Sequence, residues 1–439
     1  MKSTSRLTRW YGPGLVFALA VLGPGDFVAN AAVGTTNGYQ LLWALAAVLI
    51  FRFVWLDVSA KYVLTTGESL LHGYRRVGMW LVWAVLLSLL LFGHLTGLYT
   101  VVFMGQALDL LVPLPIAASA TIWSLICVVV GFALMFWGGY PIVAKVFQLL
   151  IALMGGALIV AALLADPQPG EIVRGILVPS IPPQEGFFSV VLLLSALIGT
   201  EAGSVSNLSY SYFLAEQGWR NRSFLRRQRI DLLIGIACIF SMGALLQIAA
   251  AGIELPNGRE LSDTKDLLAI FQNQGFVGTV IFALGIWSAA FSTFVGISTG
   301  YGLIVTDIYR SILRPDSSGA FETGEQRVAD RTPAIKVASV DSGARPHHKD
   351  AVFRSVIFFW SFSPVYILVT DVPPVWLTLA ASSAFAVMVP LTAFGLLRIT
   401  NDRKLMGDYC NRAVTNGILV ILIAVSLFLT VKNVVDLFK

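Results

Sequence analysis

Long runs of apolar residues, separated by short polar segments, dominate the pattern of this chain. We count eleven apolar stretches that are long enough to cross roughly 30 Å of hydrocarbon. The apolar positions within them are continuous, so the pattern predicts an all-α membrane protein and excludes the alternating strands of a β-barrel. The predicted spans are 13–34, 40–64, 79–108, 113–137, 142–165, 187–214, 230–253, 277–308, 352–371, 374–398 and 414–435.

Composition agrees with that pattern and excludes several classes of protein. Apolar residues make up 56% of the 439 residues and charged residues only 13%, and the mean hydropathy is +0.78. A soluble domain usually carries about 25% charged residues. The deficit excludes a cytosolic enzyme, a disordered chain and a nucleic-acid binder, so the expected surroundings of the chain are a lipid bilayer.

The positions of Lys and Arg predict the orientation in that bilayer. Most of these basic residues lie in the N-terminal tail and in the loops after spans two, four, six, eight and ten. The positive-inside rule therefore places the N-terminus in the cytoplasm and the C-terminus outside, and we expect a bacterial inner membrane. The hydrophilic segment 315–350 lacks apolar periodicity, which predicts a disordered cytoplasmic loop.

Two of the predicted spans are interrupted at their centres by residues that break helices. The first span contains Gly23-Pro24-Gly25-Asp26, and the sixth contains Gly199-Thr200-Glu201-Ala202-Gly203-Ser204. Such breaks are tolerated where the freed backbone groups face a cavity or another protein segment. Spans one and six are equivalent positions of two five-span halves, and interrupted spans at such positions indicate a transporter substrate site.

This arrangement predicts one transmembrane transporter domain that covers residues 1–439. An odd number of spans in each half makes the two halves inverted relative to each other. The predicted parts are a first repeat, a second repeat and an extra helix, at 13–165, 187–398 and 414–435.

Each interruption carries one carboxylate, Asp26 in the first span and Glu201 in the sixth. A carboxylate inside the membrane is costly unless it meets a cation, a proton or a donor. Together with free backbone carbonyls, two carboxylates form an oxygen-only site that suits Mg²⁺, Ca²⁺ or Mn²⁺. Two alternatives stay open: Asp26 can cap the second half of its helix and bind nothing, and Glu201 can be protonated and face away from the site.

Several segments resemble the Nramp family of divalent-metal transporters, in the right order from about residue 12 to 435. Gly23-Pro24-Gly25-Asp26 is similar to the family's DPGN motif, and two further segments match at 38–43 (GYQLLW) and 401–407 (NDRKLMG). The resemblance implies a LeuT-like fold with eleven helices and a 5+5 inverted repeat with broken helices one and six. It also implies alternating access, in which spans one, two, six and seven rock against the rest.

The resemblance places a metal site at Gly23, Asp26, Thr200 and Gly203, with Glu201 as a candidate second carboxylate. The carboxylate of the DPGN motif has moved from its first position to its last, and Gly203 stands where the family has a methionine. A methionine sulfur favours transition metals. Its absence resembles the divergent Nramp-related magnesium transporters, so we expect Mg²⁺ first and Mn²⁺ second.

Other polar residues are candidates for supporting roles. His94 stands where the family has an acidic residue of the proton path; it can relay protons or be neutral and hydrogen-bonded, and the sequence favours the second reading. Proton coupling is therefore not predicted. Asp57 and Lys61 are four residues apart, which predicts a structural or gating ion pair near the cytoplasmic end of the span. Ser382 and Ser383 can hold the ion's water or pack between helices, and the sequence favours packing. Asn207 can face the cavity or bond a neighbouring helix, and the sequence leaves both open.

The sequence therefore predicts a secondary transporter that imports a divalent metal cation, works as a monomer and needs no cofactor. A carrier of a small organic cation or amino acid is the alternative, because the same fold hosts both classes; Asp26 would then bind an ammonium group. A third reading, an intramembrane enzyme or receptor, has no HExxH, GxSxG or CxxC motif to support catalysis.

Overall fold

The computed structural model describes residues 23–137, 140–183, 188–202, 205–216, 218–252, 261, 264–313 and 349–437. Within these ranges every regular element is a helix. Eight of the described helices are long and apolar enough to cross a membrane, or nine if the bent pair at 152–164 and 169–177 forms one span. The all-α membrane architecture is confirmed. The count of eleven spans stays a prediction, since part of span one lies outside the described residues.

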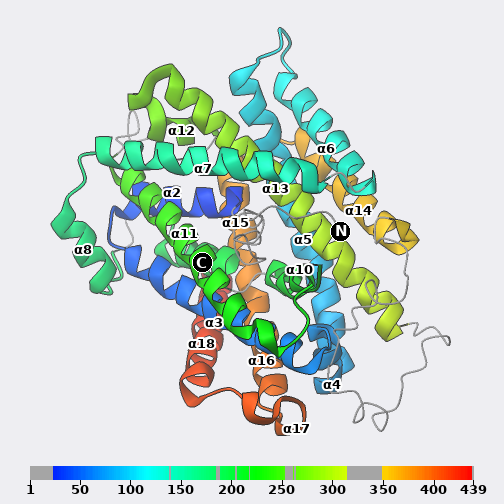
Figure 1. The fold of residues 1–439 in the computed structure, drawn as a ribbon. Coiled ribbons are helices and arrows are strands. Elements are labelled where there is room, and N and C mark those ends of the chain that lie inside the picture. Colours follow the sequence, from blue (N-terminus) through cyan, green and yellow to red (C-terminus); the bar gives the residue numbers. More distant parts are fainter. Residues whose placement is uncertain are drawn as a thin grey trace, which may run out of the picture.

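The predicted spans correspond to the following helices in chain order (Figure 1): α2 (Pro24–Asn37), α3 (Leu42–Thr66), α5 (Met79–Leu111), α6 (Ser119–Trp137), α7 (Tyr140–Leu164), α9 (Val190–Leu197) with α10 (Ser209–Glu216), α11 (Leu225–Ala251), α13 (Gly275–Asp307), α14 (Ala351–Phe362), α15 (Pro374–Phe385) with α16 (Val389–Thr400), and α18 (Ala413–Leu437). Shorter helices connect them: α4 (Leu70–Val77), α8 (Pro169–Leu177), α12 (Thr264–Leu268) and α17 (Arg403–Met406).

Two helices are much longer than the hydrocarbon core is thick. The α5 and α13 helices have 33 residues each, which corresponds to about 50 Å at a rise of 1.5 Å per residue. The sequence predicted long spans at these positions. The two helices pack against each other, and α6, α7 and α14 pack around them. The pair α5 and α13 is therefore a central packing element of the bundle.

The expected interruptions coincide with the start of a helix in span one and with changes of helix type in span six. The α2 helix begins at Pro24, where the missing N–H of proline has no intrahelical partner to lose. In span six, α9 continues as a π-helix, η2 (Ile198–Ala202), and a 3₁₀ turn, η3 (Val205–Leu208), precedes α10. Residues 203 and 204 lie outside the described part of the chain. A π-helical turn leaves the regular ladder of hydrogen bonds and often marks a functional site.

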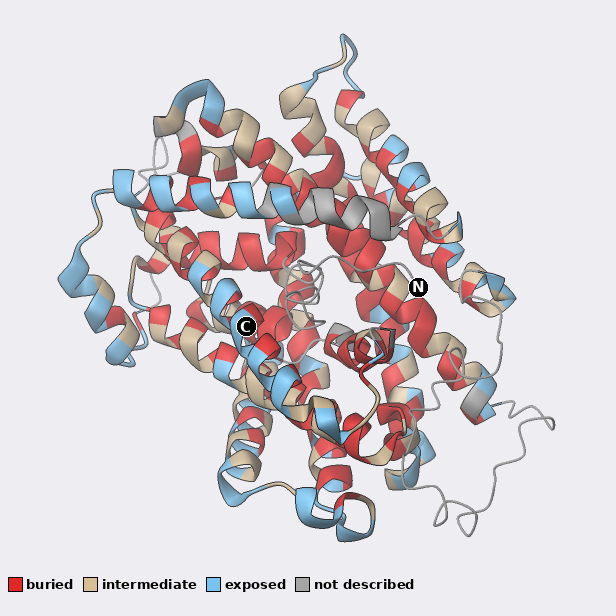
Figure 2. Ribbon diagram, in the orientation of Figure 1, coloured by how far each residue is buried: buried red, intermediate tan, exposed pale blue. Residues whose placement is uncertain are grey.

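The short α2 helix lies inside the bundle, packed against α9, α11 and α15. Nearly all of its residues are buried, and Figure 2 shows it in the buried colour. A Cβ atom on Gly34 would lie 2.4 Å from the backbone oxygen of Gln247, so α2 approaches α11 as closely as glycine allows. Other helices expose part of their surface: Leu87 and Leu91 of α5 and Val129 of α6 are more than half exposed, as expected for side chains that face lipid.

The predicted cytoplasmic loop 315–350 lies outside the described residues except for its last two. Of these, Asp350 caps α14 by accepting hydrogen bonds from the backbone N–H groups of Val352 and Phe353. Asp350 also forms an ion pair with Arg310, with 2.6 Å between the charged atoms. The disorder predicted for this loop stays a prediction.

Gly199 is a point where the interrupted region η2 depends on close backbone contact with α15. A Cβ atom there would lie 1.9 Å from the backbone oxygen of Ser382 in α15. We predict that Gly199→Ala pushes η2 from α15 and costs about 1–3 kcal/mol of stability. Thermal unfolding of the detergent-solubilised protein measures this loss. The control is Gly156→Ala in α7, where no atom lies within 4 Å; equal melting temperatures for the two variants would contradict the packing.

Candidate functional site

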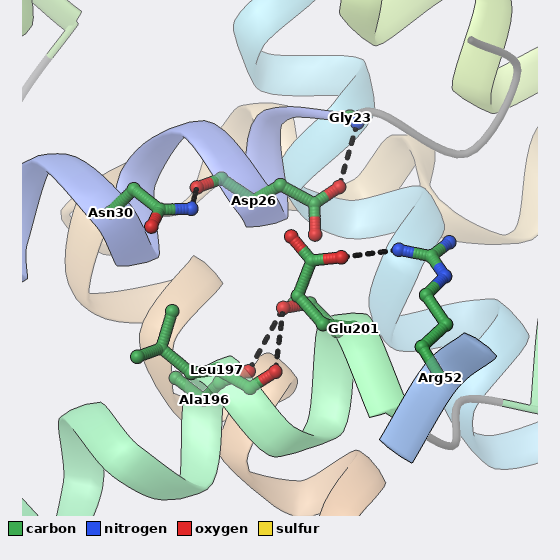
Figure 3. A network of polar contacts seen from close by, with 8 residues as sticks. Gly23, Asp26, Asn30, Arg52, Ala196, Leu197 and Glu201 are labelled. Carbon is green, nitrogen blue, oxygen red and sulfur yellow. Dashed lines mark hydrogen bonds and ion pairs between the residues drawn. The ribbon is translucent and has the colours of Figure 1, made fainter. Parts of the chain in front are cut away.

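Asp26 lies in the first turn of α2 and uses one carboxylate oxygen to close that turn (Figure 3). Its Oδ2 accepts a hydrogen bond of 3.0 Å from the backbone N–H of Gly23. The backbone oxygen of Asp26 accepts a bond of 2.8 Å from the Asn30 side chain, and Gln247 in α11 donates in turn to Asn30. Asp26 therefore does cap the start of its helix, as one of the two alternatives for this residue expected. The cap uses only one oxygen of the carboxylate, Oδ2.

Glu201 lies in the π-helical turn η2 and forms an ion pair with Arg52, which comes from the middle of α3. Both side chains are buried: the accessible fraction of the side chain is 0% for Arg52 and 1% for Glu201. The bond joins Nη1 of Arg52 to Oε2 of Glu201. A buried ion pair of this kind offsets the cost of removing each charge from water.

The carboxyl groups of Asp26 and Glu201 point toward each other across the interruption (Figure 3). The oxygens that face the gap, Asp26 Oδ1 and Glu201 Oε1, are buried and have no hydrogen-bond donor among the described residues. Two ionised carboxylates in such a position repel each other unless a cation or a proton lies between them. The sequence left open which way Glu201 faces; in the structure it faces Asp26.

A pocket opens beside these two carboxylates. Its lining comes from α2, η2, α5, α13 and α15, and consists of Gly23, Gly25, Asp26, Thr96, Tyr99, Thr200, Thr293, Ile297, Tyr301 and Phe385. The absence of a side chain at Gly25 keeps this space open, because a Cβ atom there would lie within 3.4 Å of Tyr99, Thr200 and Ser382. The lining residues offer carboxylate, hydroxyl and backbone oxygens but no sulfur and no imidazole.

The resemblance implied backbone ligands at Gly23, Thr200 and Gly203. The two of these that the structure describes, Gly23 and Thr200, lie at this pocket. The backbone oxygen of Gly23 accepts a hydrogen bond of 3.2 Å from the N–H of Phe27, and the hydroxyl of Thr200 bonds back to the backbone oxygens of Ala196 and Leu197. Gly203 lies outside the described residues.

The three other polar candidates, Asn207, Ser382 and Ser383, differ in their surroundings. The hydroxyl of Ser382 is buried near Gly25 and has no partner in the described ranges. Ser383 turns away and donates to the backbone oxygen of Ala380. Asn207 in η3 is fully buried, and neither of its amide atoms has a partner among the residues that the structure describes.

His94 lies on another side of α5. Its ring nitrogens are hydrogen-bonded to the hydroxyls of Ser363 and Tyr366, at 3.0 and 3.1 Å, and its ring stacks on that of Tyr366. The pocket is lined instead by Thr96 and Tyr99 of the same helix. These contacts agree with the reading of His94 as a hydrogen-bonded residue.

The predicted ion pair between Asp57 and Lys61 is wrong. Asp57 accepts two hydrogen bonds of 2.9 Å each from the guanidinium of Arg229 in α11, while the ammonium of Lys61 donates to the side chain of Asn411. A planar guanidinium matches the two oxygens of a carboxylate, which a single ammonium cannot do. Neither residue lines the pocket.

Sequence reasoning missed Arg52 as a member of the site. Its signal was present, because an arginine in the middle of an apolar span needs a buried counter-charge. Glu201 is an intramembrane carboxylate on another predicted span, and the two could have been paired on that ground. What the sequence did not provide was the contact between α3 and η2.

The described residues contain no group of three or more His, Cys, Asp or Glu side chains that could hold a metal ion. A cation in this pocket would instead meet the carboxylate of Asp26 together with neutral oxygens, and Glu201 faces that carboxylate from beside the pocket. Magnesium needs few protein carboxylates because it usually keeps several of its waters. The arrangement can therefore bind a small, hard cation whose remaining ligands are water.

A substitution at His94 tests whether this residue belongs to the site. We predict that His94→Gln lowers stability by about 1 kcal/mol through the altered hydrogen bonds and leaves metal binding within two-fold of the wild type. Titration of purified protein with Mn²⁺, at two pH values, measures the binding. A change in the pH dependence of binding would show that His94 does take part.

Comparison with known proteins agrees with the geometry. Residues 14–436 match the family model described as natural resistance-associated macrophage protein-like (Nramp). The chain is 23% identical to a divalent metal cation transporter, MntH, of Chromohalobacter salexigens, over 94% of this chain and 87% of that one. It is 24% identical to the MntH protein of Bacillus subtilis over 65% and 68% of the two chains.

Solved structures share the fold. The manganese transporter of Eremococcus coleocola superposes with a TM-score of 0.73 at 15% identity, and the match covers 97% of this chain and 87% of that one. A nucleobase-cation-symport-1 family transporter matches with a TM-score of 0.56 at 14% identity, over 95% and 91% of the chains. The chain therefore has the fold of these transporters, as the sequence predicted, and it belongs to the Nramp family.

Proposed function

We propose that this protein imports a divalent metal cation across a bacterial inner membrane, with Mg²⁺ preferred over Mn²⁺. Residues 1–439 form one transporter domain, made of the repeats 13–165 and 187–398 and the extra helix 414–435. The protein acts as a monomer with its N-terminus in the cytoplasm and its C-terminus outside. Asp26 is the principal ligand of the ion.

One observation carries this proposal. Asp26 Oδ1 and Glu201 Oε1 face each other in a buried place, and neither has a donor in the described part of the chain. Another buried carboxylate, that of Asp307, accepts hydrogen bonds from Ser69 and Tyr212. The contrast supports a binding role for the first pair, because polar atoms left without partners cost free energy that a bound ion regains.

The donor set supports a hard ion. The lining supplies oxygen atoms, and the hydroxyls of Thr293 and Ser382 are buried without partners among the described residues. These hydroxyls can hold water molecules of a partly hydrated Mg²⁺. The relatives are named as transporters of divalent metal cations, which supports the charge of the cargo, while the lack of sulfur in the pocket lining supports magnesium over softer metals.

Membrane potential provides a driving force for this import. A charge that crosses the membrane gains about 2.3 kcal/mol per 100 mV, so a divalent cation gains about 4.6 kcal/mol. His94, the candidate for a proton path, is engaged with Ser363 and Tyr366. We therefore propose that the ion enters without an obligatory proton.

Aromatic side chains at the pocket favour a second candidate function. Tyr99, Tyr301 and Phe385 are among the residues that line it, and aromatic rings attract the ammonium groups of organic cations. In this alternative, the protein carries a small organic cation or amino acid, and Asp26 binds its ammonium group. Thermal unfolding in the presence of MgCl₂ or of a set of primary amines distinguishes the two. We expect stabilisation by Mg²⁺ and none by the amines; the reverse would favour the second candidate.

Substitution of Asp26 tests the proposed function directly. We predict that Asp26→Asn lowers Mg²⁺ flux into proteoliposomes at least about 100-fold, since loss of a buried charge contact of about 3 kcal/mol corresponds to that factor. The measurement uses a fluorescent Mg²⁺ indicator, an imposed inside-negative potential and parallel recording of Mn²⁺ entry and internal pH.

Asp57→Asn is the matched control, because it makes the same chemical change at a carboxylate that pairs with Arg229 away from the pocket. This variant should transport at a rate within about three-fold of the wild type. Entry of Mn²⁺ with acidification and without Mg²⁺ would contradict the proposed ion and the proposed lack of coupling. Equal flux through Asp26→Asn and the wild type would remove Asp26 from the site.

A further inference from the structure

The outward face of α3 ends in two charged residues that the proposed transport site does not use. Four residues of this face follow one another at intervals of three or four and therefore share one side of the helix: Ile50, Val54, Asp57 and Lys61. All four are partly or largely exposed, and Ile50 is 56% exposed, whereas Trp55 on the other side is fully buried. The face is therefore apolar where it meets lipid and charged at one end.

Positive charges gather at that end of α3. Arg229 of α11 and Arg412, which directly precedes α18, both lie close enough to Lys61 to interact with it electrostatically. These three residues, which we call the basic cluster, are accompanied by the carboxylate of Asp57, which accepts two hydrogen bonds from Arg229. Like charges that are held together repel one another, so a further anion among them would stabilise the cluster.

The basic cluster has hydrogen-bond donors for such an anion. The ammonium of Lys61 has three N–H groups, and it donates to a neutral acceptor, the side-chain oxygen of Asn411, at 2.7 Å. Arg229 binds Asp57 through Nε and Nη2, which leaves Nη1, and Arg412 is exposed. Guanidinium and ammonium groups together suit an anion with several oxygens, and phosphate is one that both commonly bind.

We propose that the basic cluster binds the phosphate of an anionic phospholipid, whose acyl chains lie along the apolar part of the same face of α3. The helices α11 and α18 lie beside α3 and pack against it (Figure 1), and each exposes apolar side chains, such as Leu233 and Ile421. Basic residues between transmembrane helices bind lipid headgroups in this way. The cytoplasmic leaflet follows from the orientation proposed above, and the identity of the transported ion does not enter.

Tyr409 indicates that the basic cluster lies at the level of the lipid headgroups. Tyrosine is enriched at the boundary between hydrocarbon and water, and Tyr409 is 37% exposed. The guanidinium of Arg222 lies 4.9 Å from the centre of its ring and contacts the backbone oxygen of Thr65 at 3.5 Å. Thr65 is about one helical turn beyond Lys61 in α3, so a further positive charge stands beside the cluster at nearly the same depth.

The basic cluster differs from the basic residues that the positive-inside rule places in cytoplasmic loops. Arg403 and Lys404 of α17 are of that ordinary kind, because they are exposed and lie in the loop after span ten. Lys61 instead lies within the predicted span 40–64 and is half-buried on a face that meets lipid. A lysine in such a place extends its ammonium toward the interface, and here the ammonium is held at Asn411 beside the other members of the cluster.

The experiment is a competition assay on the purified full-length protein in detergent, without divalent metal. The probe is phosphatidylglycerol with a fluorescent label on one acyl chain. The competitors are unlabelled phosphatidylglycerol, phosphatidylethanolamine with the same acyl chains, and inorganic phosphate in excess. We expect phosphatidylglycerol to compete at a concentration at least about ten-fold lower than phosphatidylethanolamine, because only the former has a net negative charge. Inorganic phosphate should not displace the probe, since it lacks the acyl chains.

Variants of single charges locate the site. We expect Lys61→Gln and Arg412→Gln each to weaken binding of the labelled lipid by about five-fold, the effect of one basic residue near a membrane surface. Asp57→Asn removes the negative charge and should tighten binding. The matched control is Arg354→Gln in α14, where the guanidinium lies 4.1 Å from the centre of the Phe136 ring; it should bind within about two-fold of the wild type. Arg412 is exposed, so its variant tests the site even if Lys61→Gln does not fold.

The outcomes are distinguishable. Equal competition by the two lipids, displacement of the probe by inorganic phosphate, or equal weakening by Arg354→Gln and Arg412→Gln would each overturn the inference. Weaker binding in Lys61→Gln and Arg412→Gln together with tighter binding in Asp57→Asn supports it. A protein that binds phosphatidylglycerol in this way but transports no metal contradicts the proposed function alone. A protein that transports metal but does not prefer the anionic lipid contradicts this inference alone.

Discussion

The ion pair between Arg52 and Glu201 is the contact on which the centre of this protein depends. It joins the middle of α3 to the π-helical turn of span six, and it places the remaining oxygen of Glu201 opposite Asp26. Breaking such a pair by removing one partner leaves an uncompensated charge in an apolar interior, at a typical cost of about 3–5 kcal/mol. The positions of α2, α3 and η2 are therefore linked through charge as well as through packing.

The capping of α2 explains why Asp26 is suited to this place. Its Oδ2 satisfies the backbone N–H of Gly23 at the start of the helix, where the helix dipole also favours a negative group. The same contact fixes the direction of the carboxylate, so Oδ1 is held toward Glu201 without a donor of its own among the described residues. In Asp26, Oδ2 caps the helix and Oδ1 is left for the binding role that we propose. The sequence analysis had treated capping and binding as alternatives.

Residues whose roles follow from local patterns were predictable, while residues whose roles depend on tertiary contacts were not. Helix breaks at Gly23-Pro24-Gly25 and around Glu201 follow from residue type alone; in the structure α2 begins at Pro24, and the helix type changes around Glu201. The partner of Asp57 was mispredicted, because spacing along one helix indicated Lys61 whereas Arg229 on α11 offers the better geometry. Arg52 stands in the middle of an apolar span, but its partner lies 149 residues away in sequence, so local patterns do not pair the two.

The distribution of charge over the helices also bears on how the site could open. Asp26, Arg52 and Glu201 lie on α2, α3 and η2, whereas α5 and α13 contribute uncharged Thr96, Tyr99, Thr293 and Tyr301 to the opposite wall. Separating the opposite charges of Arg52 and Glu201 in an apolar medium is costly. Moving α5 and α13, which contribute uncharged residues, relative to these charges does not carry that cost. Movement of the three charged elements as one unit against α5 and α13 would keep the charges together, and this division is compatible with the rocking of spans one, two, six and seven that the resemblance implies.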